Sequence, residues 1–220
     1  MRAIAPKIED RGIDEIYVEL TDLVGTGAED AAWGRARDLA AAIQRAVREA
    51  TGLSCSIGVA PNKLLAKIAS DLEKPGGVTI VRACDVRERI WPLPARRITG
   101  IGPKSDARLD ALGIRTVGDL AAVDPDLLAA RFGARYGAWM HRAAWGLDER
   151  PVVTSSEPKS ISRETTFERD LHAVRDREAL SAAFTRLCEK LAEDLRRKGY
   201  RGRSDIDGIS ASLADRRADT

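Results

Sequence analysis

The stretch Thr51–Gly77, TGLSCSIGVAPNKLLAKIASDLEKPGG, decides the fold of this 220-residue chain. Up to Val59 it alternates apolar residues with small polar ones, which is typical of a half-buried strand. Asn62 then stands where a helix N-cap is expected, and apolar residues at helical spacing follow it: Leu64, Leu65, Ile68 and Leu72. Pro75-Gly76-Gly77 ends the helical pattern. The stretch therefore predicts a strand followed by a helix that packs on it.

The segments on either side extend this alternation. Upstream, Ile13–Asp22 alternates like a strand, and Trp33–Ala50 carries apolar residues on one helical face before the Thr51-Gly52 cap. Downstream, Val78–Arg82 is typical of another short strand. Strand, helix, strand, helix, strand predicts a small α/β layer with its helices on one face, and we assign it to residues 1–92.

A different kind of structure is expected in residues 93–152, where short helical patterns are interrupted by glycines. The segment Ile98–Leu120, ITGIGPKSDARLDALGIRTVGDL, has the glycine spacing of a helix–hairpin–helix. Such a motif presents the N–H groups of a tight loop to a DNA phosphate and positions the DNA without reading its bases. The loop residues concerned are Gly100, Ile101, Gly102 and Lys104. The alternative is an ordinary helical hairpin with a Gly-Pro turn.

The last part of the chain combines a linker, a long helix and a basic cluster. Residues 153–158 are rich in Ser, Glu and Pro, as linkers are, and a third domain is expected over residues 159–203. Within it, Lys159–Leu171 predicts an edge strand and Asp176–Lys198 predicts a helix with a leucine-rich face. The cations of Arg196–Arg203 can either neutralise phosphates or complement the dipole at the helix C-terminus, and the sequence leaves both open.

Two groups of charged residues could carry chemistry. The adjacent acids Asp14 and Glu15 are suited to Mg²⁺, which prefers oxygen ligands, although surface acid pairs are common and neighbours on an ideal strand point to opposite faces. Both carboxylates could reach one ion only from a turn or bulge. The lysines of Ala60–Lys67, together with Lys74, could bind phosphate beside a helix N-terminus. The alternative is a solvated lysine face.

The composition excludes several classes of protein. The formal net charge is +2, so any contact with nucleic acid must come from local patches. No apolar run approaches the length of a membrane span, and the first ten residues lack the apolar core of a signal peptide. The three cysteines form no CxxC pair, which argues against a zinc ribbon and for a reducing compartment. We expect a cytoplasmic location and no membrane partner.

Taken together, these segments resemble the Y-family DNA polymerases of the bacterial DNA polymerase IV type. The resemblance occurs in the family's order and covers most of the chain up to about Arg203. The stretches that carry it are GIDEIYVELTD (Gly12–Asp22), Thr51–Gly77 quoted above, LPARRITGIGPKSDARLDALGIRTVGDL (Leu93–Leu120), GLDERPV (Gly146–Val152) and KSISRETTFERDL (Lys159–Leu171).

The resemblance implies an α+β fold: a partial palm of βαβαβ type in residues 1–92, a helical helix–hairpin–helix thumb in 93–152, and the start of a βα little-finger domain in 159–203. It also implies a reaction, the attack of a primer 3′-hydroxyl on the α-phosphate of a dNTP, assisted by two Mg²⁺ ions. Copying past lesions during DNA repair and the SOS response to DNA damage would be its role. The implied partners are primer–template DNA, dNTP and a sliding clamp.

The resemblance further implies roles for particular residues. Asp14 and Glu15 would be two carboxylates of the two-metal site, and Lys74 would contact the incoming triphosphate. The loop Gly100–Lys104 would hold the backbone of the primer–template DNA. The little-finger domain would add further DNA contacts from Ser160, Arg163 and Arg201.

The chain also departs from the family pattern. Gly12 replaces the serine of the SIDE motif, and Gly76 replaces the asparagine of KPNG. We find no counterpart of the first catalytic strand with its aspartate, of the fingers domain or of the clamp-binding tail, and we expect Ser204–Thr220 to be a divergent, frayed tail. We therefore expect little or no polymerase activity from these 220 residues. The alternatives to an enzyme are a catalytically inactive DNA-binding remnant or accessory module, and a gene product without a selected role.

Overall fold

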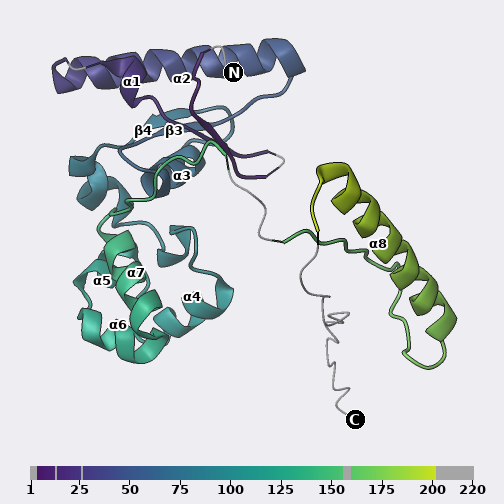
Figure 1. Ribbon diagram of the computed structural model, residues 1–220. Coiled ribbons are helices and arrows are strands. Elements are labelled where there is room, and N and C mark those ends of the chain that lie inside the picture. Colours follow the sequence, from purple (N-terminus) through teal and green to yellow (C-terminus); the bar gives the residue numbers. More distant parts are fainter. Residues whose placement is uncertain (1–3, 13, 26, 156–159, 202–220) are drawn as a thin grey trace. The chain divides into compact units, whose positions relative to one another are not determined.

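The computed structural model describes residues 4–12, 14–25, 27–155 and 160–201. The chain divides into two compact units, Met1–Ser156 and Glu157–Thr220 (Figure 1). The predicted tail 204–220 and residues 156–158 of the predicted linker 153–158 lie outside the described residues. Among the described helices, none has the length and apolar composition that crossing a membrane would require.

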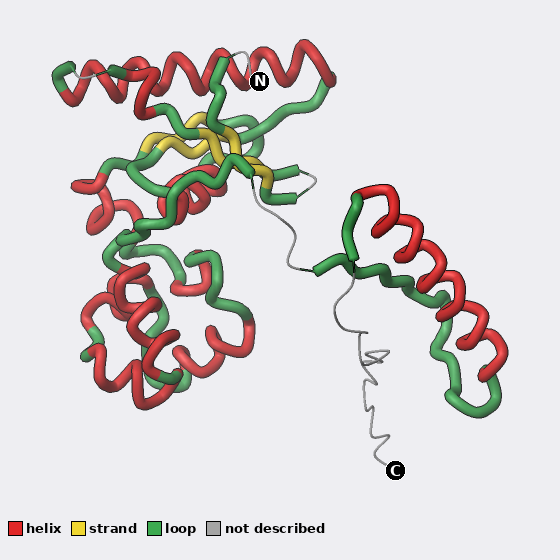
Figure 2. The backbone as a smooth tube through the Cα atoms, in the orientation of Figure 1, coloured by secondary structure: helices red, strands yellow, loops and turns green. Residues whose placement is uncertain are grey.

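The strands of the first unit are short and form two separate pairs (Figure 2). β1 (Ile8–Asp10) runs antiparallel to β2 (Ile16–Val18), and β3 (Ile57–Val59) runs parallel to β4 (Val78–Ile80). The predicted mixture of strands and helices is confirmed, but the prediction of one continuous layer is wrong for the described residues. The strand predicted to begin near Leu53 is also shorter than expected, because Leu53 is 68% exposed and only Ile57–Val59 meets a partner strand.

The helices of the strand region are α1 (Thr21–Val24), α2 (Glu29–Thr51) and α3 (Lys63–Leu72). Two predicted boundaries are confirmed: Gly52 ends α2 in the left-handed conformation, and the Asn62 side chain accepts a hydrogen bond from the Leu65 N–H at 3.0 Å. Each cap satisfies backbone groups that the helix itself leaves unpaired.

The helices α2 and α3 pack on opposite faces of the β3–β4 pair, so the prediction of helices on one face is wrong. Val59 packs with Ala36 and Ala40 of α2. The intervening residue, Gly58, faces α3, where a Cβ atom would lie only 2.0 Å from the Ala66 carbonyl oxygen. Because successive residues of a strand point to opposite faces, one short strand supports both helices.

The helical part of the first unit follows β4. It comprises η1 (Ala83–Asp85), η2 (Val86–Ile90), η3 (Ala95–Arg97), α4 (Pro103–Asp110), α5 (Val117–Ala122), α6 (Pro125–Phe132) and α7 (Ala134–Ala144). One buried cluster runs from Leu64 in α3 to Ala144 in α7. The Trp91 indole N–H also donates to the Ala144 carbonyl at 3.0 Å. The predicted domain boundary after residue 92 lies within this continuous core, and the domain limits stay predictions.

The second unit is described from Ser160 to Arg201 and contains α8 (Arg177–Lys198). The predicted helix is confirmed to within one residue. The predicted edge strand is wrong for the part that is described, because residues 160–171 form no strand. An edge strand needs a neighbour to accept its hydrogen bonds, and the described residues of this unit provide none. The leucines of the predicted apolar face of α8 are partly buried in the described unit. Phe184, on the same face, is 50% exposed and counts as an exposed residue.

Candidate functional site

The two predicted metal ligands, Asp14 and Glu15, lie in the connection between β1 and β2. The Arg11 N–H donates to the Glu15 carbonyl oxygen at 2.9 Å, which closes this hairpin just beyond the paired strands. The acids therefore lie at a turn, the arrangement that the sequence required for both to reach one ion. Asp14 is exposed, and its side chain forms no hydrogen bond or ion pair with the described residues.

A chain of ion pairs along α3 connects this hairpin to Lys74. The Lys67 ammonium contacts the Glu15 carboxylate and lies 4.0 Å from Asp71, and the Lys74 ammonium lies 2.6 Å from Asp71 on its other side. Burial disfavours the charged form of Lys67, but the Glu15 and Asp71 carboxylates outweigh it and raise the pKa of Lys67 above 10.5. One predicted metal ligand and the predicted triphosphate-binding lysine are thus brought to the same side of α3.

A second glutamate of the hairpin, Glu9, forms a buried ion pair that the sequence did not reveal. Its Oε2 accepts from the Lys63 ammonium at 2.8 Å and from the Val153 N–H at 2.8 Å. Burial raises the pKa of Glu9, but these hydrogen bonds outweigh burial and hold the pKa below 4.5. Glu9 and Lys63 are 54 residues apart, so no local pattern could have paired them.

The N-terminus of α3 is occupied by protein groups. Asp148, in the stretch GLDERPV, accepts from the Leu64 N–H at 3.1 Å, while Asn62 caps the Leu65 N–H. Although burial opposes it, hydrogen bonding to Arg150 and to the Leu64 N–H lowers the pKa of Asp148. Of the two alternatives that the sequence left open here, a phosphate site and a solvated lysine face, neither describes Lys63, because a carboxylate accepts from the Leu64 N–H group that a phosphate would need and the Lys63 ammonium is bound to Glu9.

The described residues do not complete a metal centre. Asp14 and Glu15 offer carboxylate oxygens of the kind that Mg²⁺ prefers, and Mg²⁺ commonly takes only one or two protein carboxylates. Yet Glu15 already contacts Lys67, and no group of three His, Cys, Asp or Glu side chains in the described part of the chain could hold a metal ion. A two-metal site does not fit these residues alone.

The glycine loop is an exposed turn on a buried base. Ile98 and Ile101 are buried, and the Ile101 N–H donates to the Ile98 carbonyl at 2.9 Å. The Gly102 carbonyl accepts from the next turn of α4, at 3.0 Å from Ser105 N. The N–H groups of Gly102 and Lys104 are not donated to any acceptor in the described residues, and both residues are exposed. The loop thus offers two free N–H groups beside a lysine at the start of a helix.

Gly100, at the entrance to this loop, has a conformation that other residues avoid. Its φ is +114°, and a Cβ atom there would lie 2.6 Å from the Trp139 ring. The Trp139 ring fills the space beside the glycine. The loop is therefore fixed both by backbone conformation and by close contact.

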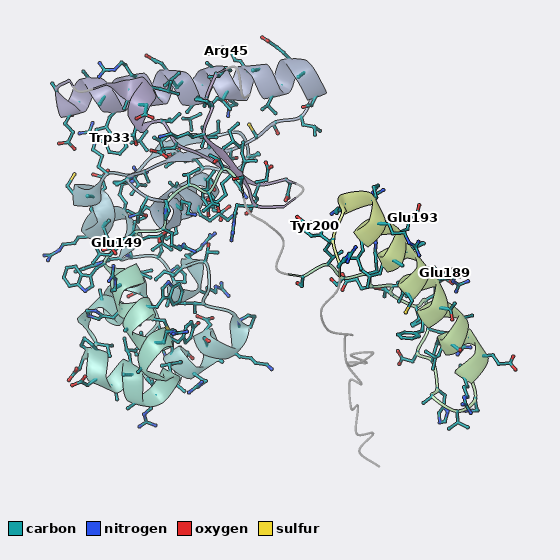
Figure 3. The ribbon with its side chains drawn as sticks, viewed as in Figure 1. Trp33, Arg45, Glu149, Glu189, Glu193 and Tyr200 are labelled. Carbon is teal, nitrogen blue, oxygen red and sulfur yellow. The ribbon has the colours of Figure 1, made fainter. Side chains whose placement is uncertain are left out.

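The predicted DNA-binding residues of the second unit have different surroundings. Arg163 donates to the buried Asp194 carboxylate of α8, with Nε 2.5 Å from Oδ2. Arg163 is the largest influence on Asp194 and lowers its pKa. Ser160 and Arg201 are exposed. Acidic side chains, including Glu189 and Glu193, project from α8 (Figure 3), so the surface of this helix is mixed in charge rather than uniformly basic.

Comparison with known proteins identifies related polymerases along most of the chain. Residues 1–71 match the impB/mucB/samB family, residues 96–148 match the thumb domain of DNA polymerase iota, and residues 158–205 match the C-terminal domain of the impB/mucB/samB family. DNA polymerase IV of Methanoculleus marisnigri is 46% identical over 200 residues, which cover 91% of this chain and 52% of that protein. DNA polymerase IV of Caulobacter vibrioides is 40% identical over 200 residues, with coverages of 91% and 47%.

The solved structures agree with these matches. DinB from Sulfolobus solfataricus is 31% identical with a TM-score of 0.60, and the match covers 70% of this chain and 43% of that one. A Y-family DNA polymerase chimera is 30% identical with a TM-score of 0.63, covering 71% and 44%. This chain spans about half the length of the curated relatives that it matches. On this evidence the chain belongs to the impB/mucB/samB family, that is, to the Y-family DNA polymerases of the DNA polymerase IV type.

Proposed function

We propose that these residues form the palm and thumb of a translesion polymerase that carries out template-directed nucleotidyl transfer from dNTP to primer–template DNA. One observation carries the proposal: the ion pairs along α3 hold Glu15 and Lys74 on one side of that helix. In this arrangement Lys74 binds the incoming triphosphate, while Asp14 and Glu15 supply two carboxylates to a Mg²⁺ site that the described residues do not complete.

The glycine loop is the proposed DNA contact of the thumb. The free N–H groups of Gly102 and Lys104 donate to one backbone phosphate, and the Lys104 ammonium adds charge. In the second unit Ser160, Arg163 and Arg201 are proposed to contact DNA as well. Because Arg163 is already bound to Asp194, we propose that it lends charge to the DNA without leaving that carboxylate.

Other parts of the proposal rest on family membership alone. They are a role in the SOS response, error-prone synthesis at damaged DNA, a cytoplasmic location and a sliding clamp as a partner of the whole protein. A second candidate function is a DNA-binding module without polymerase activity. It is favoured by one observation, the lack of a three-residue metal cluster in the described part of the chain.

The two candidates are separated by measuring DNA binding and primer extension on the same 220-residue chain. We expect salt-sensitive binding to a primer–template duplex and little or no extension with Mg²⁺ and all four dNTPs. Lys104→Ala should weaken binding and reduce the slope of log K against log salt by about 0.9, the contribution of one lost phosphate contact.

The double substitution of Asp14 and Glu15 is the control for the primer-extension experiment. If the chain does extend primers, Asp14→Ala with Glu15→Ala must abolish extension while DNA binding persists, and the module hypothesis is then rejected. Binding without extension in both the unsubstituted chain and the double variant supports the module. Failure of the unsubstituted chain to bind duplex DNA at low salt would contradict both candidates.

A further inference from the structure

Tyr136, on α7, touches both ends of the glycine loop. Its hydroxyl oxygen lies 2.8 Å from the Gly100 carbonyl oxygen and 3.2 Å from Ser105 Oγ. Gly100 is the first residue of the loop, and Ser105 follows the loop in the first turn of α4. The two exposed N–H groups proposed to meet a phosphate, those of Gly102 and Lys104, lie between these two attachments.

The proton count fixes the direction of these hydrogen bonds. A tyrosine hydroxyl has one proton, and the Gly100 carbonyl can only accept, so Tyr136 donates to Gly100. The Ser105 hydroxyl then donates to the Tyr136 oxygen. A single atom on α7 thus connects the two sides of the loop, and both hydrogen bonds can be made at once.

The Tyr136 ring is itself held in place. It stacks on Trp139 with centroids 5.3 Å apart and planes at 12°, and the Phe132 ring meets it edge-on at 6.4 Å. The Arg108 guanidinium lies over Phe132 at 4.5 Å, which connects α4 to the same aromatic group. Because a tyrosine side chain has few rotatable bonds and this ring packs against two other aromatic rings, its hydroxyl is a fixed point.

We propose that Tyr136 is a positioning residue for DNA binding: through its hydroxyl it sets the direction of the Gly102 and Lys104 N–H groups toward a backbone phosphate. This inference rests on the proposed DNA-binding function of the loop. Tyr136 does not touch the phosphate itself. It acts because hydrogen bonds to a phosphate weaken steeply when donors are misaligned, and the loop has no other side chain bonded to both of its ends in the described residues.

The test is Tyr136→Phe in the 220-residue chain, which keeps the ring and removes the hydroxyl. We expect affinity for a primer–template duplex to fall about three- to tenfold, the usual value of a hydrogen bond or two. The slope of log K against log salt should stay unchanged because no cation is lost, in contrast to Lys104→Ala. Amide hydrogen exchange at Ile101 and Ser105, whose N–H groups donate to the carbonyls of Ile98 and Gly102, should accelerate in the free protein.

Tyr17→Phe is the matched control, since it removes a tyrosine hydroxyl from β2 rather than from the thumb and should leave affinity and loop exchange unchanged. Ser105→Ala should weaken binding in the same way, and combining it with Tyr136→Phe should cost less than the sum of the two.

Each outcome decides the question. If the unsubstituted chain binds DNA and Tyr136→Phe binds equally well, the positioning role is overturned while the proposed function stands. A reduced salt slope in Tyr136→Phe would also overturn it, since this would mean that charge contacts were lost. If the unsubstituted chain does not bind DNA, the proposed function and the inference that rests on it both fail.

Discussion

The glycine loop Gly100–Lys104 and the acid hairpin between β1 and β2 are both exposed turns that the sequence singled out for chemistry, yet the structure supports them differently. The loop rests on buried isoleucines, an aromatic stack and a tyrosine hydroxyl that contacts both of its ends. The acid hairpin is held by two short strands and by ion pairs to α3. Packing shapes the first turn and charge holds the second.

This difference predicts which substitutions each turn tolerates. A turn held by packing has one conformation and tolerates changes of charge, whereas a turn held by ion pairs depends on every partner remaining charged. Within the hairpin the dependence is uneven, because Glu9 is buried with Lys63 while Glu15 meets Lys67 near the surface. The following substitutions test these statements on one observable, tryptophan fluorescence, since all four tryptophans lie in the first unit.

The largest effect is expected when the buried ion pair is broken. Lys63→Met removes the closer of the two cations beside the buried Glu9 carboxylate and leaves only the exposed Arg11 at 3.6 Å, so it should lower the free energy of unfolding by about 4 kcal/mol. Lys67→Met is the matched control on the same helix. Its partner Glu15 is 48% exposed at the side chain and can be solvated, so the loss should be below about 1 kcal/mol. Urea unfolding followed by fluorescence measures both.

Equal losses in these two lysine variants would contradict the distinction between the buried and the exposed pair. A double variant tests the same distinction between the buried and the exposed ion pair. Replacing both members of the buried pair, as Glu9→Gln with Lys63→Met, should recover part of the loss, because no unpaired charge then remains inside.

A smaller effect is expected at the entrance to the glycine loop. Gly100→Ala places a methyl group at positive φ and 2.6 Å from Trp139, and should cost about 3 kcal/mol. Gly113→Ala has a similar backbone, with φ of +78°, but open space around its Cβ, so only the conformational cost of about 1 kcal/mol remains. The excess at Gly100 measures the contact with Trp139, and thermal unfolding of the two variants should reveal it. Indistinguishable melting temperatures would show that the loop is not fixed by packing.

The smallest effect is the dependence of stability on pH. The pKa of Glu9 is lower in the folded protein than its usual 4.5, so its ion pair stabilises the fold above that pH and the contribution is lost as pH falls through the lowered value. The free energy of unfolding of the unsubstituted chain should therefore drop more steeply in acid than that of Glu9→Gln. Parallel curves would indicate that Glu9 is no more ionised in the folded state than in the unfolded one.

Much of this architecture could be predicted from local patterns. The strand before Asn62, the cap at Asn62, the long helices α2 and α8 and the helical glycine-rich region all follow from periodicity and capping residues, which act over a few positions. The predictions that were wrong concern contacts between segments that are distant in the sequence. The strand predicted over Lys159–Leu171 has no neighbour in the described residues, and the helices were assigned to one face because periodicity does not say which side of a strand a helix covers.

In the candidate site, too, some residues could be found from local sequence patterns and others only from contacts between distant segments. The acids of the hairpin and the residues of the loop were found by their types and spacing, and the family match explains why those motifs stand in that order. Lys67, Asp148 and Tyr136 were not assigned their roles, because each acts on a segment far away in sequence: Glu15, the N-terminus of α3, and Gly100.

The sequence by itself determined the order of the long helices and of the strands at Ile57–Val59 and Val78–Ile80, and the glycines that permit a tight loop. These are consequences of backbone conformation, which neighbouring residues set. The tertiary structure alone decided which charges are buried together, which helix N-terminus is already filled and which hydroxyl spans the loop. Those outcomes depend on burial and on distances between remote side chains, where the energy of a charge or hydrogen bond is set by what surrounds it.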